Sequence, residues 1–173
     1  MGILGGGGSP ESTEHRATGA LRFRPTVQAN ALFGYQWIVG PVTLAGLVGP
    51  ELDYERGSDP VADRSRTRAG LRGHAELWAH PTPDTLLTAT LIAGSARGHV
   101  WSRLSAGYAV WDRVFIGPEA SFYRTDDYRE LRLGAHVTGL TWSGWNWRLS
   151  GGFMRVEDDR AGAYVGVTGY LRM

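Results

Sequence analysis

The sequence contains no cysteine, which excludes disulfides and any zinc site with cysteine ligands. It also lacks a long apolar run, because threonine interrupts even the stretch from Leu86 to Ala93, and the mean hydropathy is −0.24. A membrane protein built from apolar helices is therefore excluded. The 18 basic and 17 acidic residues give a formal net charge of +1, which provides no positive surplus for binding nucleic acid.

The first residues lack the features of a secretory signal peptide. Met1 to Leu4 carry no basic residue, and four glycines, Gly5 to Gly8, follow where an apolar segment would be needed. We expect the chain to begin inside its domain, with a signal peptide and early strands encoded upstream.

Apolar and polar residues alternate with a period of two through almost the whole chain, and no segment shows the 3.6-residue period of a helix. The length of 173 residues fits one domain. The pattern predicts nine strands, at residues 27–37, 42–54, 66–79, 85–95, 99–111, 114–124, 129–141, 145–155 and 163–173. Residues 1–26 are interpreted as an early strand plus a loop, with a partial tenth strand at 2–8 or 17–24.

The two faces of these strands differ in chemistry. In segment 42–54, Leu44 and Val48 share a face that lies opposite Glu51 and Asp53. A soluble sandwich would bury the aliphatic face, whereas a membrane barrel turns it toward lipid and keeps the charges inside. We favour an up-and-down antiparallel outer-membrane β-barrel, because the segments exceed the roughly 5–6 residues usual in soluble sheets. The aliphatic side chains expected to face lipid include Leu44, Val48, Leu71, Leu77, Leu133, Val137, Val165 and Val167.

Tryptophan is concentrated at every second turn. Six of the seven tryptophans lie there, namely Trp37, Trp78, Trp111, Trp142, Trp145 and Trp147. Every second turn of an up-and-down sheet lies at the same end, so these residues predict an aromatic belt at one membrane interface. Single-chain bacterial barrels have an even number of strands with both termini at the short-turn end, so at least one strand should precede Val27.

A short motif occurs twice. Val48-Gly49-Pro50-Glu51-Leu52 resembles Ile116-Gly117-Pro118-Glu119-Ala120. Proline cannot donate to the ladder, so each motif is expected to mark a bulge or bend, with its glutamate facing the lumen. We interpret the repeat as shared wall geometry and not as a pair of functional carboxylates.

Charged residues on the polar faces predict a network inside the barrel. Its candidate members are Glu51, Arg68, Arg72, His74, Glu76, Glu119, Arg132 and Arg148. Mixed charges in a narrow barrel are expected to pair and fill it. The alternative is a polar groove for a glucan, in which Trp101 and Tyr123 at the loop end would stack on sugar rings.

Catalytic chemistry has weak support. His74 and Glu76 lie two residues apart on one strand face, about 7 Å along it, and can touch. No nucleophile motif surrounds Ser102 or Ser105, which lie on opposite faces, and His80 is too distant along an extended strand to share a metal with His74. We therefore predict no catalytic residues, no metal site and no cofactor.

Several segments together resemble one family. Ala31 to Trp37 followed by Gly40 to Leu44 resembles the "GYQW…GPLTL" signature of the cellulose biosynthesis protein BcsS family. The likeness continues, in the right order, through Ala75-Glu76-Leu77-Trp78, Ser105-Ala106-Gly107-Tyr108, Phe115 to Ala120, Arg132-Leu133-Gly134-Ala135 and Leu149-Ser150-Gly151-Gly152. The final residue, Met173, departs from the aromatic residue that often ends an outer-membrane strand.

The resemblance implies a secreted α-proteobacterial barrel in the outer membrane with an accessory, non-enzymatic role in cellulose or exopolysaccharide export. Its implied partners are outer-membrane lipid, the glucan and the cellulose synthase machinery. Two alternatives stay open: an outer-membrane lipid or glycan hydrolase, and a soluble β-barrel that binds a small ligand.

Overall fold

The computed structural model describes residues 2–14, 21–55, 65–126, 128–157 and 161–170, and all regular structure in these ranges is antiparallel β. The ten strands are β1 (Gly2–Glu14), β2 (Leu21–Val39), β3 (Val42–Glu55), β4 (Arg66–Ala79), β5 (Thr85–Gly94), β6 (His99–Trp111), β7 (Val114–Arg124), β8 (Arg129–Trp142), β9 (Trp145–Val156) and β10 (Ala161–Tyr170). They form one sheet in chain order, so the up-and-down topology is confirmed.

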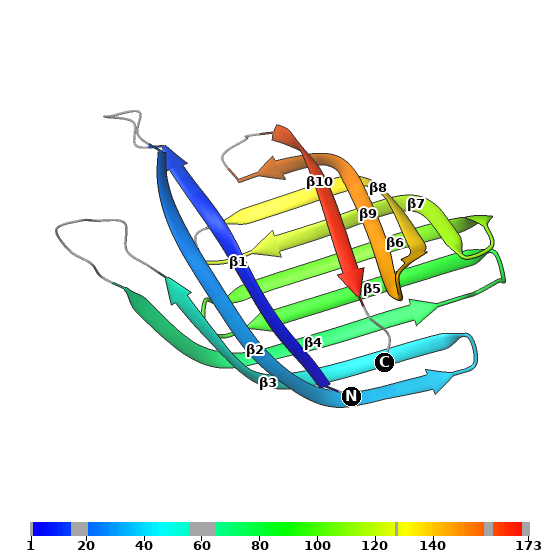
Figure 1. Ribbon diagram of the computed structural model, residues 1–173, viewed down its shortest axis with the longest axis horizontal. Helices are drawn as coiled ribbons and strands as arrows, with labels where there is room; N and C mark the ends of the chain where they lie inside the picture. The colour runs from blue at the N-terminus through cyan, green and yellow to red at the C-terminus, as the bar shows by residue number, and fades with distance from the viewer. Residues whose placement is uncertain (1, 15–20, 56–64, 127, 158–160, 171–173) are drawn as a thin grey trace.

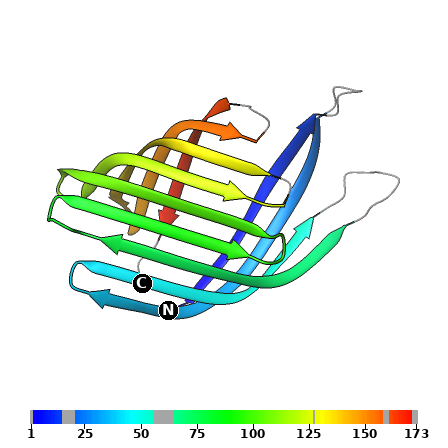
Figure 2. The ribbon, with the colours of Figure 1, turned by 180° about the vertical axis from the view of Figure 1, so that it is seen from behind.

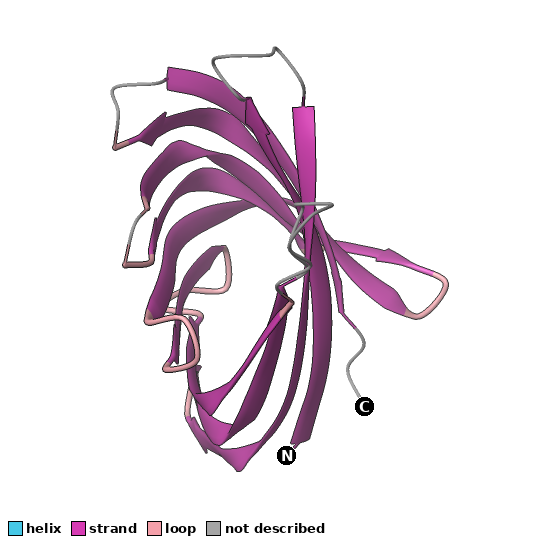
Figure 3. Cartoon of the chain, turned by 90° about the vertical axis from the view of Figure 1, so that its left-hand side faces the viewer, coloured by secondary structure: helices cyan, strands magenta, loops and turns pink. Residues whose placement is uncertain are grey.

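The sheet curls so that its two edge strands, β1 and β10, come to the same side of the molecule (Figure 1). The view from behind shows the continuous wall from β4 to β8, and the side view shows its concave profile (Figures 2 and 3). Within the described residues β1 does not pair with β10, so the sheet is open. β1 begins and β10 ends at the end that holds the β2–β3, β4–β5, β6–β7 and β8–β9 turns.

Seven of the nine predicted strands agree with the structure to within one residue at each end. The other two differ: β2 spans Leu21–Val39 and not 27–37, and β10 begins at Ala161 and not at residue 163. The predicted end of that last strand, residues 171–173, lies outside the described residues. β2 includes Pro25, although proline has no backbone N–H to donate to a neighbouring strand. Its direct partner in β1 is another proline, Pro10. The glycine run lies in β1, which confirms an early strand.

The aliphatic faces point outward. Leu44, Val48, Leu71, Leu133, Val165 and Val167 are between 41% and 87% exposed, and Leu77 and Val137 are partly exposed. The buried side chains are mostly polar: Glu51, Asp53, Thr88, Thr90, His99, Ser105, Glu119, Ser121, Glu130, His136, Thr138 and Arg148. The aliphatic residues therefore do not meet across a core, which confirms the predicted orientation of both faces.

The inner wall also has an apolar part that the sequence analysis did not predict. Leu32 on β2 is 1% exposed and clusters with Ala45 and Leu47 of β3. Leu86 on β5 is also buried, at 2% exposed. These residues alternate with outward-facing neighbours that are apolar too, so hydropathy alone could not assign them to a face.

We expected a bulge or bend at each of the two prolines, and the structure has no bulge there. The register is the same on both sides of Pro50 and Pro118, although the β2–β3 pairing skips Pro50 and the β6–β7 pairing skips Pro118. The register shifts instead between Ala109 and Trp111 and between Thr138 and Leu140. The second shift contains Gly139, whose φ of 95° is favourable for glycine and typical of a bulge.

Candidate functional site: the polar inner wall

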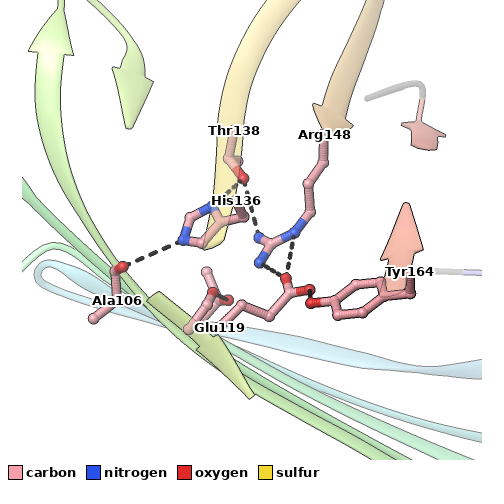
Figure 4. Close-up of polar contacts among 8 residues, drawn as sticks. Ala106, Glu119, His136, Thr138, Arg148 and Tyr164 are labelled. Carbon is pink, nitrogen blue, oxygen red and sulfur yellow. Dashed lines mark hydrogen bonds and ion pairs between the residues drawn. The ribbon is translucent and has the colours of Figure 1, made fainter. Parts of the chain in front are cut away.

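The most buried polar group of the inner wall surrounds Glu119 of β7, which is 6% exposed (Figure 4). Arg148 of β9 donates to the Glu119 carboxylate through Nε at 3.1 Å and also through Nη2. The Tyr164 hydroxyl of β10 donates to the second carboxylate oxygen at 3.4 Å. Gly134 of β8 leaves space for this contact, because a Cβ there would lie 2.6 Å from the Tyr164 hydroxyl oxygen.

Two residues of β8 extend this group toward the turn end. Arg148 donates through Nη1 to the Thr138 hydroxyl oxygen at 3.0 Å. His136 Nδ1 lies 2.9 Å from the same hydroxyl, and His136 Nε2 lies 3.3 Å from the Ala106 carbonyl oxygen (Figure 4). A carbonyl can only accept, so Nε2 carries the proton, Nδ1 accepts, and the Thr138 hydroxyl donates to it. Every hydrogen bond from Arg148 through Thr138 and His136 to the Ala106 carbonyl then joins a donor to an acceptor.

A second buried group lies on the opposite part of the wall, around Glu51 of β3. Its carboxylate lies 3.8 Å from Arg72 Nη1 and 3.9 Å from His99 Nε2, and it accepts a hydrogen bond from the Ala96 backbone nitrogen at 2.8 Å. Arg97 Nη1 reaches the carboxylate of Asp53 at 3.9 Å. The β5–β6 connection is thereby attached to the inner face of β3.

The remaining members of the predicted network form separate contacts. His74 and Glu76 meet at 2.9 Å within β4, and Arg132 Nε donates to Glu130 within β8. Arg68 Nε is buried and has no hydrogen-bond partner among the described residues. The Arg132 guanidinium also lies 5.3 Å from the ring centroid of Tyr164, which connects its pair with Glu130 to the Glu119 group. The contacts around Glu51 and those of His74 with Glu76 form groups of their own.

The serines and the histidine that the sequence analysis weighed for catalysis lie apart on the sheet. The Ser105 hydroxyl lies 2.6 Å from that of Thr88, and in the described ranges neither Ser102 nor Ser105 is bonded to a histidine. His80 is exposed and its ring stacks at 5.7 Å from that of Phe115. No group of three or more His, Cys, Asp or Glu side chains within the described part of the chain is arranged to hold a metal ion.

The predicted stacking residues lie side by side at the loop end. Trp101 of β6 and Tyr123 of β7 are direct cross-strand partners, and both are partly exposed. The Arg103 guanidinium lies 5.2 Å from the Trp101 ring centroid, and the Tyr128 ring lies 6.0 Å from that of Tyr123. Three aromatic rings and a guanidinium therefore share this part of the inner wall.

Tyr128, in the β7–β8 connection, was missed by the sequence analysis. Its hydroxyl donates to Glu130 at 2.6 Å, and burial together with this carboxylate raises the pKa of Tyr128 to about 12. The phenol is therefore neutral over the physiological range and acts as a donor. An isolated tyrosine in a charged loop carries no sequence signal for this role.

The six tryptophans near the short turns differ in exposure and in the face that they occupy. Trp37, Trp111, Trp142 and Trp145 are 41–79% exposed, as an interfacial belt requires. Trp147 is partly buried and covers Gly169 of β10. Trp78 does not join the belt: it shares the inward face of β4 with Glu76, to which it is hydrogen-bonded. Proximity to a turn suggested the belt, whereas strand parity decides the face.

Strand parity could also have found the buried residues that were missed. Asp53 follows Glu51 on one face of β3, and His136 and Thr138 follow Arg132 on one face of β8. Tyr164 lies on the inward face of β10. His99 carries no such signal, because it is the first residue of β6 and enters the interior at the strand's start.

No helix in the described part of the chain has the length and apolarity needed to cross a membrane. No curated protein matches the sequence, and no solved structure matches the fold. The family model described as "Cellulose biosynthesis protein BcsS" matches residues 6–172, which is nearly the whole chain and includes every residue of the two buried groups. The chain belongs to the cellulose biosynthesis protein BcsS family.

Proposed function

We propose that this member of the BcsS family is an outer-membrane β-barrel that assists cellulose biosynthesis without catalysing a reaction. The observation that carries the location is the orientation of the faces: valine and leucine point outward while Glu119, Arg148 and Glu51 are at most 6% exposed inside. Water would favour the opposite arrangement, whereas lipid favours this one.

The two ends of the sheet support an orientation in the membrane. Four short turns and the exposed tryptophans lie at one end, which is typical of the periplasmic side of such barrels. The longer, charged connections then face outside. The edges of the described sheet, β1 and β10, each need a strand partner in lipid, where unpaired backbone groups are costly.

The interior supports an accessory role and not an open conduit. Many of its charged side chains are paired, and the contacts of Glu119 with Arg148 and Tyr164 join β7, β9 and β10 across the interior. A glucan would then be engaged at the external end, where Trp101 and Tyr123 lie side by side. Aromatic rings stack on the apolar faces of glucose units, and Arg103 with Glu130 would supply hydrogen bonds at their edges.

Gene deletion tests this proposal. We expect the deletion strain to keep an inner-membrane synthase that makes glucan in membrane preparations, while cellulose at the cell surface falls or is mislocalised. Complementation with the wild-type gene should restore surface cellulose, and Trp101→Ala/Tyr123→Ala should restore it poorly although the protein reaches the outer membrane in normal amount. Unchanged surface cellulose after deletion would remove the accessory role.

A further inference from the structure

A basic cluster lies on the outside of the barrel at the loop end, away from the inner wall. Its members are Arg124 at the end of β7, Arg129 at the start of β8 and Arg155 near the end of β9, and all three are exposed. They lie on the same face as the lipid-facing residues of these strands. Nothing in the inner-wall groups accounts for them.

The pairing register arranges this surface in rows. Arg124 is the direct cross-strand partner of Arg129, and Arg155 is the direct partner of Leu131. Phe122 and Leu131 form the next row toward the middle of the barrel and are 37% and 45% exposed. The surface therefore changes from guanidinium to apolar within about one residue pair, as at the boundary between lipid headgroups and acyl chains.

Arg124 and Arg129 are like charges placed directly opposite each other, an arrangement that destabilises an antiparallel pair. The ion pair that Arg129 makes is with Glu157 at 3.8 Å, and both partners are about half exposed, at 54% and 49%. An exposed ion pair of this kind does little to offset the repulsion. An anion bound between the guanidinium groups would offset it.

A shallow hollow of about 180 Å³ lies at this place. Arg129, Arg155, Glu130 and Glu157 are its charged lining residues, and Phe122, Leu131 and Val156 line its apolar part. Arg124 lies beside the hollow as the cross-strand partner of Arg129. Guanidinium groups bind phosphate through paired hydrogen bonds, and the apolar part suits an acyl chain. The combination fits one molecule that carries both groups.

We propose that the hollow on β7, β8 and β9 binds a phosphorylated lipid of the leaflet at the loop end, with its phosphate between Arg124, Arg129 and Arg155. This inference rests on the proposed membrane location. The ligand class is a phosphorylated, acylated glycolipid such as lipid A. The bound lipid fixes the vertical position of the barrel and screens the repulsion between Arg124 and Arg129.

The experiment places the protein in phosphatidylcholine nanodiscs that contain a small fraction of lipid A, and measures lipid A retained on the protein by native mass spectrometry. Arg124→Gln/Arg129→Gln should retain it about 30-fold less tightly than the wild type, because each arginine contributes about fivefold at a membrane surface. Arg113→Gln, an exposed arginine in the β6–β7 turn at the opposite end, is the matched control and should retain it normally.

Two further arms identify the source of the phosphate. The wild type should retain dephosphorylated lipid A poorly, to the same extent as the double variant retains lipid A. Inorganic phosphate should not displace lipid A from the wild type. Equal retention by the wild type and the double variant would overturn the inference and leave the membrane location intact, and so would displacement by inorganic phosphate. Failure of the wild-type protein to enter nanodiscs would overturn the membrane location and this inference together.

Discussion

Glu119 and Arg148 form an ion pair that crosses over a strand: β7 and β9 contribute the two side chains, and β8 lies between them. Both side chains are 3% exposed. A charge this deeply buried is stable only with its partner, so the pair joins three strands of the wall. Tyr164 of β10 adds the fourth strand.

Glu119→Gln should therefore lower the free energy of unfolding by about 3–5 kcal/mol, because it leaves the Arg148 guanidinium buried without a counter-charge. The measurement is guanidinium-induced unfolding of the protein in detergent micelles. Glu157→Gln, which breaks the exposed pair with Arg129, is the control and should cost less than about 1 kcal/mol. Equal losses in the free energy of unfolding for the two variants would show that burial does not determine how much each ion pair contributes to stability.

Trp111 and Trp78 should behave differently although both precede a short turn. Trp111 is 79% exposed on the outside, so Trp111→Ala should weaken folding into lipid vesicles by about 1–3 kcal/mol through loss of apolar area at the interface. Trp78 faces inward, so quenching of its fluorescence by brominated lipid should be weak in a variant that keeps only this tryptophan. Strong quenching of Trp78 would contradict its assignment to the inner wall.

The hydroxyl of Tyr128 should ionise at a higher pH than an ordinary tyrosine does. Its pKa of about 12 lies above the ordinary 10.0, so the neutral form is favoured in the folded state. The stability that this group contributes is complete below pH 10 and is lost as the pH rises through 12. The difference in ultraviolet phenolate absorbance between the wild type and Tyr128→Phe should titrate with that midpoint. Glu130→Gln should lower the midpoint, and an ordinary midpoint in the wild type would contradict the buried contact.

Trp101 and Tyr123 should bind cello-oligosaccharides through stacking. Trp101→Ala should weaken binding by about 1–3 kcal/mol, by analogy with the loss seen when an aromatic platform for a planar ligand is removed. Isothermal titration of the detergent-solubilised protein checks this. Trp142→Ala, at the opposite end of the barrel and 75% exposed, is the matched control and should bind normally. Equal affinity of all three proteins would place glucan binding elsewhere or remove it.

The fold could be predicted from the sequence because strands with one apolar and one polar face follow a simple rule, alternation with a period of two. That rule assigned the outward face of Leu133 and the inward face of Arg148 correctly. It also places Leu32 and Leu47 inward, although their immediate neighbours are apolar. Leu32 shares its parity with Asn30, and Leu47 shares its parity with Glu51. The rule also says nothing of backbone bends, so the register shift at Gly139 was missed.

The site was predictable only as a set of inward-facing residues. Partners such as Glu119 and Arg148 are 29 residues apart and lie on strands that are not adjacent, so their contact depends on how strongly the sheet curls. The contact of the Ala96 backbone nitrogen with Glu51 depends in the same way on a connection entering the interior. Neither the curl of the sheet nor the path of the connection into the interior is encoded in the spacing of these residues along the sequence.

The accessibility of single spin labels tests the central claim, that the outward face meets lipid, most directly. The chain has no cysteine, so one cysteine at a time can be introduced and labelled after the protein is reconstituted in vesicles. At Leu71, Leu133 and Val165 the label should collide frequently with oxygen dissolved in the bilayer and rarely with a water-soluble nickel chelate. At Arg113, in a turn, the ratio should be reversed. Free collision of the chelate with labels at all four positions would contradict the membrane barrel.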